Sequence, residues 1–191
     1  MRNLGIIIAI VTVFFIIGCR GAYKKDANLE LLMSSPIHLP LSEMEKFNNN
    51  SLEDNQEATL YKLIHFVDTQ SCSICELKAL YQWDDLLIKN NIDKLVQLCH
   101  IIEVGNHNRE DLMKAISETY FQGEVYLDSL GVFLKHNTNI PSNRLYHTFL
   151  LDKNNNVVLV GNPLNNTYIE ELLVKIVDNM NRNNGIYVPD N

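Results

Sequence analysis

The length, composition and charge of the chain limit what it can be. Of its 191 residues, 46% are hydrophobic and 20% are charged, which is typical of a globular protein and not of a disordered one. The formal net charge of -7 argues against nucleic acid as a partner, because phosphate binding needs clustered lysine and arginine. The length suffices for one domain with a hydrophobic core.

The amino terminus has the pattern of an export signal. Arg2 precedes an unbroken run of apolar or small residues over 4–18, which is shorter than the roughly 20 apolar residues that span a bilayer. The pattern predicts a secretory signal peptide over residues 1–18. Ile16-Ile17-Gly18-Cys19 resembles the lipobox of bacterial lipoproteins. The resemblance implies cleavage before Cys19 and a lipid on that cysteine; an uncleaved membrane anchor is the alternative.

The remaining chain is divided by composition. Residues 19–35 are polar and are expected to form a flexible tether, followed by one folded domain over 36–182 and a tail over 183–191. Arg20 follows Cys19 where some Gram-negative lipoproteins carry the aspartate that retains them at the inner membrane. The expected location is therefore the bacterial cell envelope, on the outer membrane, with the domain in the periplasm or at the surface.

The first half of the domain alternates between strand and helix patterns. The apolar run 63–67 predicts a central strand, and 68–71 leads into a helix that extends to about residue 90. The run 100–104 predicts a second strand, and Asn108 is placed to cap a second helix. Each helix has one apolar face, formed by Leu77, Leu80, Trp83 and Leu87 in the first and by Leu112, Met113, Ile116 and Tyr120 in the second.

The second half predicts a hairpin and a closing helix. Residues 125–128 form another short strand pattern, followed by an irregular or helical piece up to Pro141. The runs 147–151 and 157–160 enclose a polar turn, 152–156, as in a β-hairpin. Thr167 and Glu170 have capping-box spacing at the start of a last helix. This order predicts an α/β fold with a mixed sheet flanked by helices.

The residues with the clearest chemistry are Cys72 and Cys75, separated by Ser73 and Ile74. They lie where a predicted strand ends and a helix begins, so free backbone N–H groups can stabilise a thiolate there. The thiolate is the form that attacks disulfides, which makes Cys72 the candidate nucleophile and Cys75 the resolving cysteine. A static disulfide in a non-catalytic binding module and a metal site are the two alternatives.

Together these features resemble the thioredoxin superfamily, and within it the TlpA and redoxin branch of membrane-anchored proteins. The resemblance covers about residues 60–180 and depends on the strand, the Cys72-x-x-Cys75 pair, the long helix and the distant Thr148-Phe149-Leu150-Leu151-Asp152 hairpin. It implies a thioredoxin-like fold and a thiol–disulfide oxidoreductase without a cofactor. The implied partners are a client protein or a small thiol or disulfide, and an electron donor in the membrane.

Three positions depart from the pattern of that family. Ser71 replaces the usual aromatic residue before the first cysteine, and Phe66 stands where many members have a buried acid. The cis-proline expected before the Thr-Phe-Leu strand is absent, and Tyr146 or His147 occupies its place. His147 is the candidate proton donor, because histidine titrates near neutrality; a local hydrogen-bonding role is the alternative.

Four further side chains are weaker candidates. Cys99 is expected to be a buried structural cysteine. Cys99, His100 and the Cys72–Cys75 pair are together a candidate zinc site. Adjacent strand residues such as Cys99 and His100 point to opposite faces of a sheet, which argues against a shared metal. Asp68 is a substitute proton acceptor or a turn residue, and Glu76 either disfavours thiolate formation at Cys75 or is a solvated helix residue.

Overall fold

The protein folds around a six-stranded mixed sheet. The structure is a computed structural model and describes residues 26–48, 61–105, 108–119, 121 and 123–189. The strands, in the spatial order β1-β4-β3-β2-β5-β6, are β1 (Glu45–Asn48), β4 (Glu124–Asp128), β3 (Val96–Glu103), β2 (Tyr61–Val67), β5 (Thr148–Leu151) and β6 (Val157–Val160). The pairs β2–β3 and β3–β4 are parallel and the other pairs are antiparallel. The α/β prediction is confirmed.

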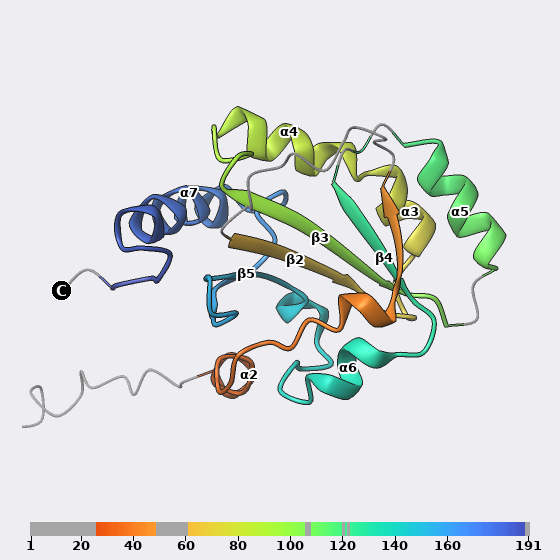
Figure 1. Cartoon of the computed structure of the whole chain (residues 1–191), viewed down its shortest axis with the longest axis horizontal. Helices are drawn as coiled ribbons and strands as arrows, with labels where there is room; N and C mark the ends of the chain where they lie inside the picture. The colour runs from red at the N-terminus through yellow and green to blue at the C-terminus, as the bar shows by residue number, and fades with distance from the viewer. Residues whose placement is uncertain (1–25, 49–60, 106–107, 120, 122, 190–191) are drawn as a thin grey trace, which may run out of the picture.

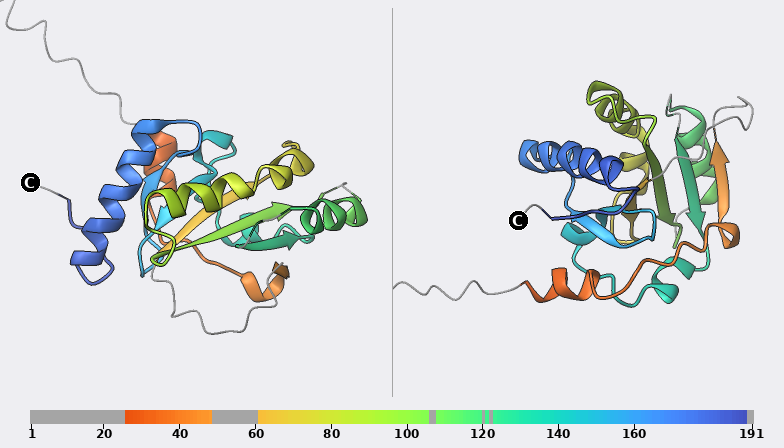
Figure 2. Two further views of the ribbon diagram at one scale, coloured as in Figure 1. Left: turned by 90° about the horizontal axis from the view of Figure 1, so that it is seen from above. Right: turned by 60° about the vertical axis from the view of Figure 1, so that its left-hand side comes forward.

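Helices cover both faces of the sheet. The α-helices are α2 (Ala27–Leu32), α3 (Ser73–Lys78), α4 (Tyr81–Lys89), α5 (Arg109–Ser117), α6 (Val132–His136) and α7 (Thr167–Arg182). Two 3-10 turns, η1 (Leu41–Glu43) and η2 (Arg144–Tyr146), connect strands and helices. Helices α3, α4, α5 and α7 lie on one side of the sheet, and α2 and α6 lie on the other (Figures 1 and 2). Each face therefore has its own buried apolar cluster, which the alternation of strand side chains separates.

The predicted hairpin is confirmed, and Asp152 shapes its turn. Strands β5 and β6 are antiparallel neighbours. The buried Asp152 accepts hydrogen bonds through Oδ1 from the backbone N–H groups of Asn154 at 2.8 Å and Asn156 at 2.9 Å. Asn155 takes the left-handed conformation with φ of 61°, which asparagine tolerates well. The polar turn of the sequence is thus closed by side chain to backbone hydrogen bonds.

The helices differ from the sequence prediction in two details. The long helix expected after Ser71 is two helices, α3 and α4, because backbone bonds between them span three residues, such as Leu80 N–H to Leu77 C=O. The capping-box prediction was wrong, because Asn166 caps helix α7 and Glu170 instead binds Lys89 and Asn90. The residues predicted for the apolar faces are buried, except that Met113 is partly buried and Tyr120 lies outside the described residues.

The segment expected to be a tether differs from the prediction where the structure describes it. Residues 27–32 form helix α2, whose Leu32 is fully buried, and the side chain of Asn139 donates to the carbonyls of Leu32 and Ser35. The proposed signal peptide and Cys19 lie outside the described residues. Within the part of the chain that is described, no helix has the length and apolarity needed to cross a membrane.

Candidate functional site

Cys72 and Cys75 lie between the end of strand β2 and the first turn of helix α3. The two residues form a disulfide, and both are exposed. Cys72 is the N-cap of helix α3, and its Sγ accepts a hydrogen bond from the backbone N–H of Cys75 at 3.3 Å. A sulfur that accepts a backbone hydrogen bond is stabilised when it carries negative charge. The geometry therefore favours Cys72 over Cys75 as the thiolate of the reduced pair.

A short turn positions the pair at the end of the strand. Asp68 Oδ1 accepts hydrogen bonds from the backbone N–H of Gln70 at 3.1 Å and from the hydroxyl of Ser71 at 2.7 Å. The guanidinium of Arg144, from the 3-10 turn η2, reaches the Ser71 hydroxyl at 3.4 Å. Of the two roles considered for Asp68 from the sequence, the structure shows the turn role. The Arg144 contact brings η2 next to Ser71, the residue before Cys72.

His147 follows the turn η2 and stands directly before strand β5, in the place where the family pattern has proline. Its ring is 4% exposed, and its Nε2 lies 2.9 Å from the carbonyl oxygen of Pro141. Because a carbonyl only accepts, Nε2 carries the proton and Nδ1 has a free lone pair. Nδ1 has no hydrogen-bond partner in the described chain and lies 4.0 Å from Asp68 Oδ2. Burial lowers the pKa of His147, which favours the neutral ring with its lone pair at Nδ1.

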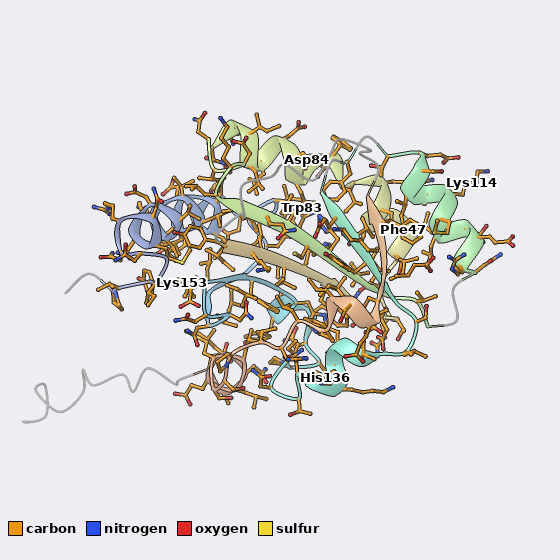
Figure 3. All side chains as sticks on the ribbon, in the orientation of Figure 1. Phe47, Trp83, Asp84, Lys114, His136 and Lys153 are labelled. Carbon is orange, nitrogen blue, oxygen red and sulfur yellow. A yellow bond between two sulfur atoms is a disulfide. The ribbon has the colours of Figure 1, made fainter. Side chains whose placement is uncertain are left out.

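A pair of buried histidines beneath helix α3 was not identified from the sequence. His65 on β2 and His100 on β3 are directly opposite in the parallel register, and their Nδ1 atoms are 3.1 Å apart. Trp83 of helix α4 packs against both rings, and Figure 3 shows it between α4 and β3. Burial lowers the pKa of His65 to about 4, and His147 adds to this effect; burial also lowers the pKa of His100.

Glu76 connects this histidine pair to the cysteines. Its carboxylate is 3.7 Å from His65 Nε2, and it follows Cys75 directly on helix α3. Partial burial raises the pKa of Glu76, so its environment differs from the solvated helix residue considered from the sequence. A carboxylate near Nε2 favours the proton on that atom, which makes His65 Nδ1 the acceptor and His100 Nδ1 the donor.

A cleft of about 820 Å³ is lined by Ser71 and Glu76, which flank the cysteine pair in the sequence, although neither cysteine lines it. His65, which lies near Glu76, also lines it. Its walls come from two loops that are far from the cysteines in sequence, the segment 142–148 and the segment 161–169. The cleft is large enough for part of a substrate, two imidazoles line it, and it reaches the disulfide through Ser71 and Glu76, the residues directly before Cys72 and directly after Cys75.

Cys99 behaves as the buried structural cysteine that the sequence predicts. It is fully buried, its thiol is free, and burial raises its pKa to about 12. It belongs to the apolar cluster on the α2 and α6 side of the sheet, whereas His100 faces the opposite side. The two side chains therefore do not meet. No group of three or more metal-ligating side chains occurs among the residues that the structure describes.

The strand order, the directions of the strands and the place of the cysteine pair define a thioredoxin-like fold. A parallel pair at the centre of the sheet, β2 and β3, is flanked by the antiparallel hairpin β5–β6, and the Cys-x-x-Cys segment starts the helix after β2. The fold that the sequence resemblance implied is thus confirmed.

Comparisons with known proteins give the following matches. No family model matches the sequence, and no curated protein matches it. A thioredoxin-like protein from Porphyromonas gingivalis is similar at 21% identity over 76% of this chain and 93% of that one, with a TM-score of 0.47. A domain of a possible thiol-disulfide isomerase from Cytophaga hutchinsonii is 20% identical over 78% of this chain and 99% of that one, with a TM-score of 0.44. The thioredoxin domain of a thiol-disulfide oxidoreductase from Bacteroides vulgatus is 18% identical over 67% of this chain and 93% of that one, with a TM-score of 0.42.

Proposed function

We propose that the protein is a thiol–disulfide oxidoreductase that exchanges disulfides through Cys72 and Cys75. The observation that carries the proposal is the exposed disulfide at the start of helix α3, whose flanking residues Ser71 and Glu76 line a cleft of about 820 Å³. A structural disulfide gains nothing from exposure next to a cleft, whereas an exchange site needs both access for a second disulfide and space for the molecule that carries it.

The chemistry takes place in two exchange steps. In the reduced protein the Cys72 thiolate attacks one sulfur of the client disulfide, forms a mixed disulfide and releases one client thiolate. The Cys75 thiolate then attacks Cys72 Sγ, re-forms the Cys72–Cys75 disulfide and releases the second client thiolate. The client gains two electrons and the dithiol of the protein loses two. A membrane electron donor is the proposed partner that returns the protein to its reduced form.

His147 is the proposed proton-transfer residue of the second step. The free lone pair at Nδ1 of a neutral, buried ring supports proton acceptance from the attacking Cys75 thiol, with donation to the leaving client thiolate afterwards. His147→Gln keeps a side-chain N–H for the Pro141 carbonyl but removes the basic nitrogen. We expect this variant to accumulate the mixed disulfide, measured by mass spectrometry after acid quenching. Wild-type levels of the intermediate would remove His147 from the mechanism.

Membrane attachment completes the proposal. The lipobox-like segment ending at Cys19 supports a lipid anchor in the cell envelope, on the outer membrane. The proposed export fits the chemistry of the cysteine pair, because disulfides form and persist outside the cytoplasm. The domain is thus proposed to meet its clients at the membrane surface or in the periplasm.

The deciding experiment combines a reduction potential with a cysteine variant. For the Cys72–Cys75 couple, glutathione equilibration should give a reversible potential between about -120 and -270 mV. Cys72→Ser should abolish the reduction of insulin by dithiothreitol that the wild type catalyses, and Cys99→Ala, which also removes one cysteine, should not. A potential below about -300 mV would identify a structural disulfide instead. Unchanged insulin reduction by Cys72→Ser would also refute the exchange mechanism.

A further inference from the structure

Three asparagines that line the cleft share one hydrogen-bonding arrangement. Each uses its side-chain Oδ1 to accept a hydrogen bond from a backbone N–H two residues further along the chain. The bonds are Asn143 to Leu145 N at 3.1 Å, Asn162 to Leu164 N at 2.9 Å and Asn166 to Tyr168 N at 2.9 Å. Asn143 and Asn166 thereby cap η2 and α7. The backbone bonds therefore fix which end of each carboxamide is the oxygen.

The fixed oxygens leave the nitrogen of each carboxamide available. A carboxamide Nδ2 has two N–H donors, and none of the three Nδ2 groups has a partner within the described part of the chain. All three asparagines line the same cleft, although they come from two separate loops. At these positions the walls of the cleft thus present unused N–H donors, while each carboxamide oxygen already accepts a backbone hydrogen bond.

The charged side chains of the cleft also favour a ligand with oxygen acceptors. Arg144, an exposed cation of the same wall, reaches Ser71 beside the disulfide. Among the described residues that line the cleft, Glu76 is the only acid, and it lies near His65 beneath the cysteines. The rim of the cleft is therefore suited to oxygen acceptors, neutral or negatively charged.

A second and independent observation lies deeper in the cleft. His147 is 4% exposed, lines the cleft and has a ring nitrogen, Nδ1, without a hydrogen-bond partner in the described structure. A buried polar atom that lacks a partner costs free energy unless a ligand or a solvent molecule satisfies it. At this position the cleft therefore lacks a donor for Nδ1, which a main-chain N–H of a bound polypeptide would supply.

We propose that the cleft binds a polypeptide segment next to its disulfide by donating hydrogen bonds to its oxygen atoms, with Asn143, Asn162 and Asn166 as the specificity-determining residues. The oxygens are main-chain carbonyls or side-chain carboxylates that flank the client cystine. This inference depends on the proposed exchange function, which it extends to the selection of clients. It predicts that a disulfide on a polypeptide is a better substrate than a disulfide on a small molecule that cannot reach the asparagines.

The test exchanges donors for acceptors without loss of the caps. Asn162→Asp and Asn166→Asp keep the oxygen that accepts the backbone N–H, in a turn at Asn162 and at the helix cap at Asn166, but they replace the N–H donors by a second oxygen. For insulin reduction by the double variant we expect KM to rise by about tenfold with little change in kcat. Bis(2-hydroxyethyl) disulfide, which is small and neutral, should be reduced at the wild-type rate.

Two controls separate donor loss from other effects. Asn108→Asp makes the same substitution at the cap of helix α5, which does not line the cleft, and should leave the KM for insulin unchanged. Asn166→Ser keeps a capping oxygen and adds no charge, and should raise the KM for insulin in the same direction as the aspartate. Two cystine peptides that differ only in glutamate or glutamine beside the cysteine identify the acceptor. A glutamate preference that disappears in Arg144→Gln indicates carboxylates, and equal KM values indicate main-chain carbonyls.

The outcomes distinguish this inference from the proposed function. If the wild type reduces both substrates but the cleft variants change the KM for insulin no more than Asn108→Asp does, the cleft proposal is overturned and the exchange function stands. An equal loss of activity toward insulin and the small disulfide also overturns it, because that loss indicates damage to the cysteine site. If the wild type reduces neither substrate, the exchange function itself is wrong and the cleft proposal is rejected with it.

Discussion

His65 and His100 are buried side by side on neighbouring strands, and the pH dependence of stability follows from their burial. One Nδ1 must donate to the other across 3.1 Å, and burial of both side chains favours neutral rings. Three titratable groups face His65, namely His100 from β3, Glu76 from helix α3 and His147 from the segment before β5. Burial dominates over the nearby carboxylate and lowers the pKa of His65 to about 4.

The first prediction concerns acid destabilisation by this pair. The pKa of an unfolded histidine is about 6.5, so between about pH 6.5 and pH 4 the unfolded chain binds the proton and the folded chain does not. His65 alone should therefore lower the free energy of unfolding by about 3 kcal/mol as the pH falls through this window. Urea unfolding at pH 7.5, 5.5 and 4.5 measures the slope.

A double variant provides the comparison. His65→Leu with His100→Leu replaces both partners by apolar groups, which is close to neutral at pH 7.5 and should flatten the slope. The single His65→Leu leaves His100 without its partner and should cost about 1–3 kcal/mol at pH 7.5. The exposed His136→Leu is the matched control. An unchanged slope in the double variant would show that other groups cause the acid sensitivity.

At the scale of secondary structure elements, the β5–β6 hairpin depends on one buried carboxylate. Asp152→Ala removes the acceptor for two backbone N–H groups of the turn and should lower the free energy of unfolding by about 2–3 kcal/mol. Asp152→Asn retains one oxygen and should cost less. Lys153→Ala, one residue further on and exposed, should stay within about 0.5 kcal/mol of the wild type. Thermal or urea unfolding tests the order, and a loss for Lys153→Ala equal to that for Asp152→Ala would contradict it.

The elements that the sequence predicted well are those whose pattern is local. The runs 63–67, 147–151 and 157–160 are apolar and bounded by polar turns, and each lies within a residue or two of strand β2, β5 or β6. Strand β1 has no such pattern, because Glu45–Asn48 contains one apolar residue and pairs only with β4 at the edge of the sheet. Helix α2 was missed because its six residues bury chiefly Leu32, through contacts made by distant parts of the chain.

The residues of the candidate site likewise fall into those that a local sequence pattern predicts and those that only the fold brings together. Cys72 and Cys75 are separated by a recognisable spacing, so sequence reasoning found them. His65 and His100 each stand inside an apolar run, and this unusual placement was a usable signal, but their pairing depends on the register of β2 against β3. The cleft could not be predicted, since its walls come from segments that only the folded sheet brings together. Asparagines are common turn residues in loops. Only the structure shows that the Oδ1 atoms of these asparagines accept backbone hydrogen bonds, which leaves their Nδ2 donors unused.

At the scale of the whole molecule, the proposed anchor limits where the site can work. Asp26, the first described residue, follows Cys19 by seven residues. Seven residues span at most about 25 Å whatever their conformation. A lipid on Cys19 would therefore hold the folded domain within a short distance of the bilayer. Clients of the proposed exchange reaction are then expected at or near the membrane surface.

The anchor is tested by removing the one cysteine that it needs. In cells that make the full chain, the wild type should incorporate a labelled fatty acid and partition into the detergent phase on Triton X-114 separation. Cys19→Ser should lose the label and enter the aqueous phase or remain as uncleaved precursor. Cys72→Ser also removes one cysteine but should keep the label, because the lipid is proposed to be on Cys19 alone. Labelling that persists in Cys19→Ser, or a wild type without label, would show that the domain is held at the membrane in another way or is released.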